Sequence, residues 1–392
     1  MFSSRTSWDR TQNALAASIA EARAAGRPLI DLTESNPTRC RIVDLAPAIQ
    51  QLGNPRGAAY EPDPLGHPAA RAAVADYYAA KGAPVDPGRV VLSASTSESY
   101  AWLFGLLADP GDRILVPHPS YPLFSWIASS QAVELSPYRL APERGFAIDF
   151  SNLERNIDER TRAVVLVHPN NPTGTFVRRD DAARIVEIAA ARDVALIVDE
   201  VFGDHGWSPA PRDAAPTFAP TDRALTFVLS GISKVLLLPQ CKLSWAVVAG
   251  PEAQAAEALA RIELVADTFL SVSTPIQLAL PDLLSSQPAI TGAVLARIAE
   301  NLRVLDAVLA GAPQTTRLPA DGGWYAIVEA PGLDEEQLAE TLVREDGVIV
   351  HPGYFFDFER EGYLVLSLLL PPADFREGAG RLVRRIAEKR AR

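Results

Sequence analysis

Residues Ser230–Trp245 read S-G-I-S-K-V-L-L-L-P-Q-C-K-L-S-W and place a lysine, Lys234, directly after a short Ser/Gly turn. The apolar run Thr226–Leu229 before that turn predicts a buried strand. A charged amine at the end of a buried strand loses hydration, so it is costly unless its charge is suppressed or used. A desolvated lysine with a lowered pKa is the amine that forms a Schiff base. Taken alone, Lys234 also fits an ordinary lysine in a loop at a strand end.

Two further motifs precede this stretch. His168–Thr175 reads H-P-N-N-P-T-G-T, Ile197–Phe202 reads I-V-D-E-V-F, and a second lysine, Lys242, lies eight positions after Lys234. In this order the motifs resemble those of the class I/II aminotransferases, aspartate-aminotransferase-like enzymes that depend on pyridoxal 5′-phosphate (PLP). The resemblance covers nearly the whole chain, and three ordered motifs are far more specific than one.

The resemblance implies a fold. It is the α/β, PLP-dependent transferase fold type I, with a mostly parallel central sheet flanked by helices and a smaller α+β domain. The pattern of the chain agrees, because the apolar segments 163–167 and 195–198 enclose a helical segment, 180–192, as in a βαβ unit.

The length of the chain, 392 residues, suits one large domain with a smaller companion. We expect residues 45–285 to form the large, PLP-binding domain, and residues 1–44 plus 286–392 to form the small domain. A helix-rich region from about residue 252 to 310 would carry the chain from one to the other.

The composition excludes several classes of partner. A formal net charge of −11 argues against nucleic acid, and no apolar run reaches the ~18 residues of a membrane span. The five histidines form no cluster with cysteines or carboxylates, so no metal site is expected. The two cysteines, Cys40 and Cys241, fit a reducing cytoplasm better than a disulfide scaffold.

Three residues with functional side chains each lie just after a predicted strand. Asn171, Asp199 and Lys234 would therefore meet at one edge of a parallel sheet, where ligands of such sheets bind. By the resemblance, Lys234 holds PLP as a Schiff base and moves the proton of the reaction, and Asp199 pairs with the ring nitrogen. Asn171 is expected to donate to the ring oxygen O3′, and Tyr121 to stack on the ring. From the residues alone, Asp199 also fits a helix cap and Asn171 a plain Asn-Pro turn.

The segment Ser95, Thr96 and Ser97 opens a predicted helix and, with Glu98, has the spacing of a capping box. Free N–H groups and hydroxyls at a helix N-terminus also suit a phosphate. The segment is therefore expected to cap the helix and bind the cofactor phosphate at once.

The resemblance assigns Ser233 and Lys242 to the phosphate as well. Lys242 supplies charge there without the two-pronged contact of an arginine. Tyr60 is expected to reach across a homodimer interface to the phosphate of the partner's cofactor. From its context, Tyr60 also fits a turn tyrosine packed on the next helix.

The chain departs from the family at two positions. Phe202 is expected against the cofactor, but it lacks the hydroxyl of the tyrosine common there. A C-terminal strand reads Y-L-V-L-S and puts Val365 where the family has the arginine that holds the substrate carboxylate. Either another cation, first of all Arg39, takes the carboxylate, or the substrate is not an ordinary α-amino acid. Arg39 also fits a solvated loop arginine. The other expected substrate contacts are Asn36 and Tyr354, and Tyr354 also fits a packed loop.

The resulting interpretation is a PLP-dependent aminotransferase that moves an amino group between an amino acid and a 2-keto acid through Lys234. The first alternative is a PLP-dependent lyase, decarboxylase or cyclase of the same fold, which Val365 favours. A PLP-binding regulator would need a DNA-binding domain, for which Met1–Arg10 is expected to leave no room. A nicotinamide dehydrogenase is not expected, because no G-x-G-x-x-G follows a predicted strand.

Overall fold

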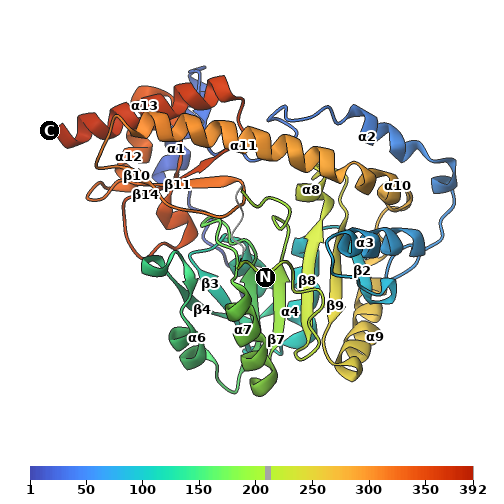
Figure 1. Cartoon of the computed structure of the whole chain (residues 1–392). Coiled ribbons are helices and arrows are strands. Elements are labelled where there is room, and N and C mark those ends of the chain that lie inside the picture. The colour runs from blue at the N-terminus through green and yellow to red at the C-terminus, as the bar shows by residue number, and fades with distance from the viewer. Residues whose placement is uncertain (208–212, 392) are drawn as a thin grey trace.

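A computed structural model describes residues 1–207 and 213–391 of the chain, and an eight-stranded sheet is its largest element (Figure 1). The strand order is β2-β9-β8-β7-β6-β3-β4-β5. Among these described strands, β9 and β5 run opposite to the other six, which confirms the mostly parallel central sheet. The strands are β2 (Val90–Ser93), β3 (Arg113–His118), β4 (Glu134–Ala141), β5 (Ala147–Ile148), β6 (Thr161–Val167), β7 (Ala195–Asp199), β8 (Thr226–Gly231) and β9 (Ser244–Ala249).

Helices cover both faces of this sheet because alternate strand residues point to opposite sides. On β6, Val164 and Leu166 belong to the core beneath α3, α6, α7 and α10, whereas Ala163 and Val165 belong to the core beneath α4, α5 and α9. The helices are α3 (Pro68–Ala80), α4 (Thr96–Leu107), α5 (Leu123–Gln131), α6 (Phe150–Asn156), α7 (Arg179–Arg192), α9 (Glu252–Phe269) and α10 (Thr274–Ser285).

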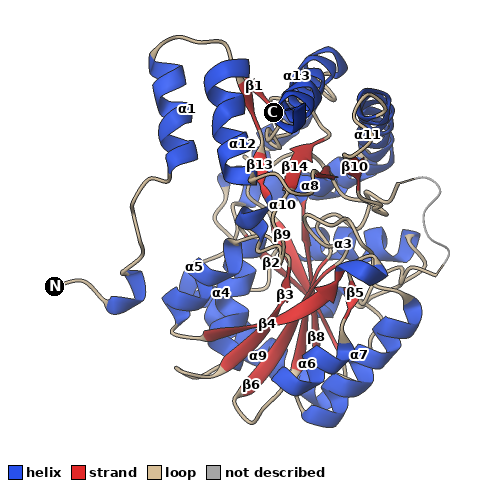
Figure 2. Cartoon of the chain, turned by 90° about the vertical axis from the view of Figure 1, so that its left-hand side faces the viewer, coloured by secondary structure: helices blue, strands red, loops and turns tan. Residues whose placement is uncertain are grey.

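A separate core lies above the carboxyl edge of the large sheet (Figures 1 and 2). It contains a four-stranded sheet of order β10-β11-β14-β13, a parallel pair of β1 and β12, and four helices. The large-domain boundaries at residues 45 and 285 stay a prediction. The elements are β1 (Ile30–Asp31), β10 (Thr316–Arg317), β11 (Tyr325–Glu329), β12 (Val348–Ile349), β13 (His351–Pro352), β14 (Tyr363–Ser367), α1 (Ala14–Ala24), α11 (Gln287–Leu309), α12 (Glu335–Thr341) and α13 (Pro372–Ala391). The short α2 (Ala46–Gln50) precedes α3. No described helix is both long and apolar enough to cross a membrane.

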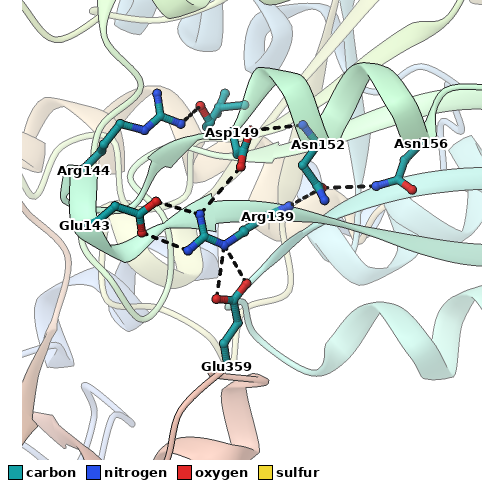
Figure 3. Close-up of polar contacts among 8 residues, drawn as sticks. Arg139, Glu143, Arg144, Asp149, Asn152, Asn156 and Glu359 are labelled. Carbon is teal, nitrogen blue, oxygen red and sulfur yellow. Dashed lines mark hydrogen bonds and ion pairs between the residues drawn. The ribbon is translucent and has the colours of Figure 1, made fainter.

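An ion-pair network ties the loop before β14 to the large sheet (Figure 3). Arg139 on β4 donates to Glu359 at 2.9 and 3.2 Å and to both carboxylate oxygens of Glu143 at 2.9 Å. Nearby, the Ser120 N–H donates to the Phe356 carbonyl at 2.9 Å. These contacts hold the loop 353–359 against the segment that leads to Tyr121.

Backbone segments cross closely where the large-sheet part of the molecule meets the separate core above it. The Trp207 N–H donates to the Asp321 carbonyl at 2.7 Å, and the Gly323 N–H donates to the His205 carbonyl at 2.9 Å. A Cβ on Gly322 would lie 2.7 Å from that His205 oxygen and 2.8 Å from a Phe176 ring carbon. Only glycine therefore allows this approach, which fixes the chain just before β11.

We predict that Gly322→Ala lowers the free energy of unfolding by about 1–3 kcal/mol, because the added methyl group has backbone on one side and a buried ring on the other. Urea unfolding measures the effect. The matched control is Gly380→Ala in α13, where a Cβ meets nothing within 4 Å. There the stability should rise by about 0.5–1 kcal/mol, because alanine favours helix. Equal effects of the two substitutions would contradict the close crossing.

Candidate active site

Lys234 lies on a single helical turn, α8 (Ile232–Val235), directly after β8. Its Nζ lies 4.8 Å from the ring centroid of Trp324 and 5.6 Å from that of Phe202. Burial lowers the pKa of Lys234 to about 8, and the charge of Asp199 opposes part of this shift. A sizeable fraction of the amine is thus neutral near pH 8, the form that attacks a carbonyl.

Asp199 is the last residue of β7 and accepts two hydrogen bonds. The Val201 N–H donates at 3.0 Å, and the hydroxyl of Tyr100 donates at 3.1 Å. Burial raises the pKa of Asp199 to about 6, while these two donors and Lys234 act in the opposite direction. The carboxyl is therefore mainly ionised at neutral pH and can pair with a cation.

Asn171 lies in the turn after β6, which its neighbours brace. Asn170 accepts from the Thr173 hydroxyl at 2.9 Å. The ring of His168 accepts at Nδ1 from the Val177 N–H at 3.1 Å and so donates from Nε2 to the Ala215 carbonyl at 2.9 Å. The Asn171 side-chain oxygen is buried and has no hydrogen-bond partner among the described residues. A side-chain amide with such an unpartnered oxygen can serve a ligand.

Ser95 caps α4, as its sequence context predicts. Its Oγ accepts from the Glu98 N–H at 3.1 Å. The Glu98 carboxylate in turn accepts from the Ala94 N–H at 2.6 Å, one residue earlier than in a standard capping box. Thr96 and Ser97 form the first turn behind this cap, so their N–H groups remain outside the ladder of the helix.

The chain folds back after α8 and brings Lys242 beside Ser233. The Ile232 N–H donates to the Leu243 carbonyl at 3.1 Å, which sets residue 242 next to the start of α8. Lys242 is exposed and has a left-handed backbone, with φ of 54°. Ser233 and Lys242 could therefore reach one ligand from the same turn.

Aromatic rings make the wall beside the amine. Phe202 is 4% exposed and packs on Trp324, with ring centroids 5.2 Å apart. His205 packs on the same Trp324 at 5.3 Å. Tyr121, by contrast, is 47% exposed on the segment held by the loop 353–359. Its exposed face is free to cover a flat ligand.

Two residues expected at the substrate, Arg39 and Asn36, interact with their own loop. Arg39 pairs with Glu34 at 3.4 Å and lines a cavity of about 390 Å³. None of Asn171, Asp199 and Lys234 is among the lining residues of that cavity. The side-chain oxygen of Asn36 accepts from the Thr38 hydroxyl at 2.8 Å and so closes its own turn.

Three further expectations concern Tyr354, Val365 and Tyr60. Burial, with the nearby charge of Glu336, raises the pKa of Tyr354 to about 12. Val365 is wholly buried in an apolar cluster with Ile327, so this position on β14 offers no cation to a substrate carboxylate. Tyr60 is 74% exposed in the single chain.

The structure adds Tyr100, Trp324 and His205 to the site. Tyr100 follows Thr96 by four positions, and helical spacing could have placed it on the same face as the phosphate segment. The Gly322-Gly323 pair could have indicated that Trp324 sits at a close crossing. No signal in the sequence singles out His205, whose contacts depend on the crossing itself.

The described residues fit PLP. A half-buried amine stands near a half-buried carboxylate that can pair with a ring nitrogen, and an amide whose buried oxygen has no partner follows the neighbouring strand. The capped start of α4 and Lys242 offer N–H groups, hydroxyls and a positive charge to a phosphate. All of them belong to the carboxyl edge of the large sheet.

Comparisons with known proteins agree with this site. The family model described as aminotransferase class I and II matches residues 27–382. Human tyrosine aminotransferase is 25% identical over 369 residues, which cover 91% of this chain and 80% of the relative. An alanine aminotransferase of Mycobacterium bovis is 29% identical over 314 residues, or 77% of this chain and 72% of the relative.

A solved structure supports the fold. An alanine aminotransferase from Pyrococcus furiosus superimposes with a TM-score of 0.89 at 23% identity. The match covers 99% of this chain and 100% of that chain. Together with the strand order, this likeness confirms fold type I.

We predict that Lys234→Met stabilises the cofactor-free protein by about 1–3 kcal/mol at pH 7, because each unit of pKa shift is worth about 1.4 kcal/mol. A lysine whose folded pKa is lowered from 10.5 to about 8 destabilises the fold below pH 8. The gain should therefore shrink as the pH rises from 8 toward 10.5. Urea unfolding at pH 7 and pH 10 measures it.

The matched control is Lys389→Met, which removes a lysine that binds Gln337 on the surface at 2.9 Å. Its effect on stability should be small and similar at both pH values. A loss of stability in Lys234→Met at pH 7 would show that the amine is not desolvated.

Proposed function

The chain belongs to the class I and II aminotransferase family, and on this premise we propose that Lys234 carries the cofactor as a Schiff base. The protein is a PLP-dependent aminotransferase that acts on an amino acid and a keto acid. The relatives described above are aminotransferases, and none favours a lyase, decarboxylase or cyclase. The observation that carries the assignment of Lys234 is the place of its half-buried amine, directly after β8 and beside the rings of Phe202 and Trp324, where burial lowers its pKa to about 8.

Bound PLP supplies an electron sink for charge that develops on the substrate carbon. Lys234 would hold the cofactor, and its amine, neutral in part near pH 8 and set beside the rings of Phe202 and Trp324, could take up and return a proton when free. Asp199 holds the ring nitrogen in its protonated form, since an ionised carboxylate with little access to water stabilises a nearby cation. Its two donors keep the carboxylate in one orientation.

The remaining proposed cofactor contacts also lie at the carboxyl edge of the large sheet. Asn171 meets the ring oxygen, and Tyr121 covers one ring face. Phe202 lies on the wall without a hydroxyl to donate. Ser95, Thr96, Ser97, Ser233 and Lys242 receive the phosphate.

The amino donor is an amino acid with an apolar or aromatic side chain. The names of the relatives specify tyrosine and alanine, and the amine of Lys234 faces the rings of Phe202 and Trp324. Arg39, Asn36 and Tyr354 remain the proposed contacts on the substrate side, although Arg39 must leave Glu34 to take a carboxylate.

The active form is a homodimer in which Tyr60 serves the phosphate site of the partner. An aromatic side chain that is 74% exposed in one chain has most of its surface left for a neighbour. A cytoplasmic location fits the two cysteines, since Cys40 and Cys241 are both free thiols.

Borohydride reduction of the PLP-loaded protein should attach the cofactor to Lys234 irreversibly. Peptide mapping by mass spectrometry should find the added mass on the peptide that contains this residue. Lys234→Ala should carry no label, whereas the control Lys242→Ala should still be labelled at position 234. Label on another lysine, or none, would refute the assignment.

Mixing of inactive subunits tests the role of Tyr60. Tyr60→Ala and Lys234→Ala should each have little activity, and refolding them together should restore it in part. A mixed dimer then holds one site with both native side chains, the lysine from one subunit and the tyrosine from the other. If mixing restores nothing while Tyr60→Ala alone is inactive, Tyr60 serves its own subunit or only the fold.

A further inference from the structure

Helix α4 contacts two parts of the site at once. Its first turn holds Thr96 and Ser97, and one turn later Tyr100 donates its hydroxyl to Asp199 at 3.1 Å. Because Thr96 and Tyr100 are four positions apart, both lie on the same face of the helix. The phosphate segment and the partner of the carboxylate thus belong to one rigid element.

The pleat of β7 explains why Asp199 meets α4. Leu196 and Val198 point into the core beneath α7, whereas Ile197 points into the core beneath α4. Asp199, two residues after Ile197, therefore projects toward α4. The contact follows from strand parity and from the position of Tyr100 on its helix.

Packing holds the ring of Tyr100 in place. The residue is wholly buried, with ring centroids 5.8 Å from Phe104 and 5.2 Å from Phe124 in edge-on contacts. Burial, with the nearby charge of Asp199, raises the pKa of Tyr100 well above its usual value. The phenol is therefore protonated at every working pH and can donate to the carboxylate.

We propose that Tyr100 is the positioning residue that keeps Asp199 ionised and aimed at the cofactor, so that α4 fixes both the phosphate end and the ring end of the bound molecule. This inference rests on the proposed function of Asp199 and Lys234. Tyr100 does not touch the reacting atoms. Its hydroxyl acts on the cofactor only through the carboxylate.

The groups that set the charge of Asp199 come from three elements. Tyr100 of α4 and the Val201 N–H after β7 donate to it, and Lys234 of α8 faces it with a positive charge. Tyr138 of β4 contributes to the raised pKa of Tyr100, but the Tyr138 hydroxyl donates to the Val165 carbonyl at 2.8 Å. Tyr138 is therefore a buried tyrosine of the same layer whose hydroxyl does not contact Asp199.

The test is a titration of cofactor-free protein with PLP between pH 5.5 and 8.5, for wild type, Tyr100→Phe, Tyr138→Phe, Asp199→Asn and Tyr100→Phe/Asp199→Asn. Tyr100→Phe should bind about tenfold more weakly at pH 7, the size of one hydrogen bond to a charged group. The pH midpoint of binding should move upward, because the carboxylate loses a donor. Tyr138→Phe should bind as wild type does.

The double variant isolates the route of the effect. Tyr100→Phe should change nothing further in the Asp199→Asn background, because the group on which the hydroxyl acts is gone. Wild-type affinity in Tyr100→Phe, or equal losses in both backgrounds, would overturn the inference while leaving the role of Asp199 intact. Wild-type affinity in Asp199→Asn would overturn the proposed function and this inference together.

Thermal unfolding of the cofactor-free proteins gives a second readout. A carboxyl whose folded pKa is raised stabilises the fold at low pH, and this contribution is lost as the pH rises through about 6. Without the Tyr100 donor, the folded pKa of Asp199 should rise further, so more of this stability should be lost as the pH rises. The loss of stability of Tyr100→Phe relative to wild type should therefore grow from pH 5 to pH 8. A deficit that is constant with pH and shared with Tyr138→Phe would indicate packing alone and would overturn the inference.

Discussion

Two ionisable side chains of opposite charge, Lys234 and Asp199, are partly withdrawn from water at one edge of the large sheet, and each bears a cost of burial. Burial lowers the pKa of the lysine to about 8 and raises that of the aspartate to about 6. Their attraction offsets only part of each shift. The surrounding structure must therefore hold a pair that is less stable than an apolar replacement would be.

The rest of the fold supplies that support. Parallel strands deliver Asp199 and Lys234 to the same edge, and α4 adds a neutral donor to the carboxylate without adding charge. The rings of Phe202 and Trp324 close the space beside the amine. Trp324 can stand there because Gly322 lets the preceding segment pass close to the His205 carbonyl. The site destabilises the fold, and the packing of the surrounding cores offsets that cost.

The sequence predicted most of this arrangement where a local rule applies. Strand periodicity placed the βαβ unit and the buried strand before Lys234, and the capping signal placed the start of α4 at Thr96 within a residue. The structure differs in a detail of that cap, since Glu98 bonds the Ala94 N–H. A neighbouring N–H was within reach, and the spacing alone cannot distinguish between the two.

The sequence by itself determined the family, the central sheet and the residues that end its strands, because hydrophobic period and ordered motifs are local properties of the chain. Only the tertiary structure decided that Tyr100 meets Asp199, that Trp324 lies over Lys234, and that Arg39 faces Glu34. These contacts join segments far apart in the chain or depend on which way a loop side chain turns. Packing of the whole molecule sets them, and no spacing of residue types encodes them.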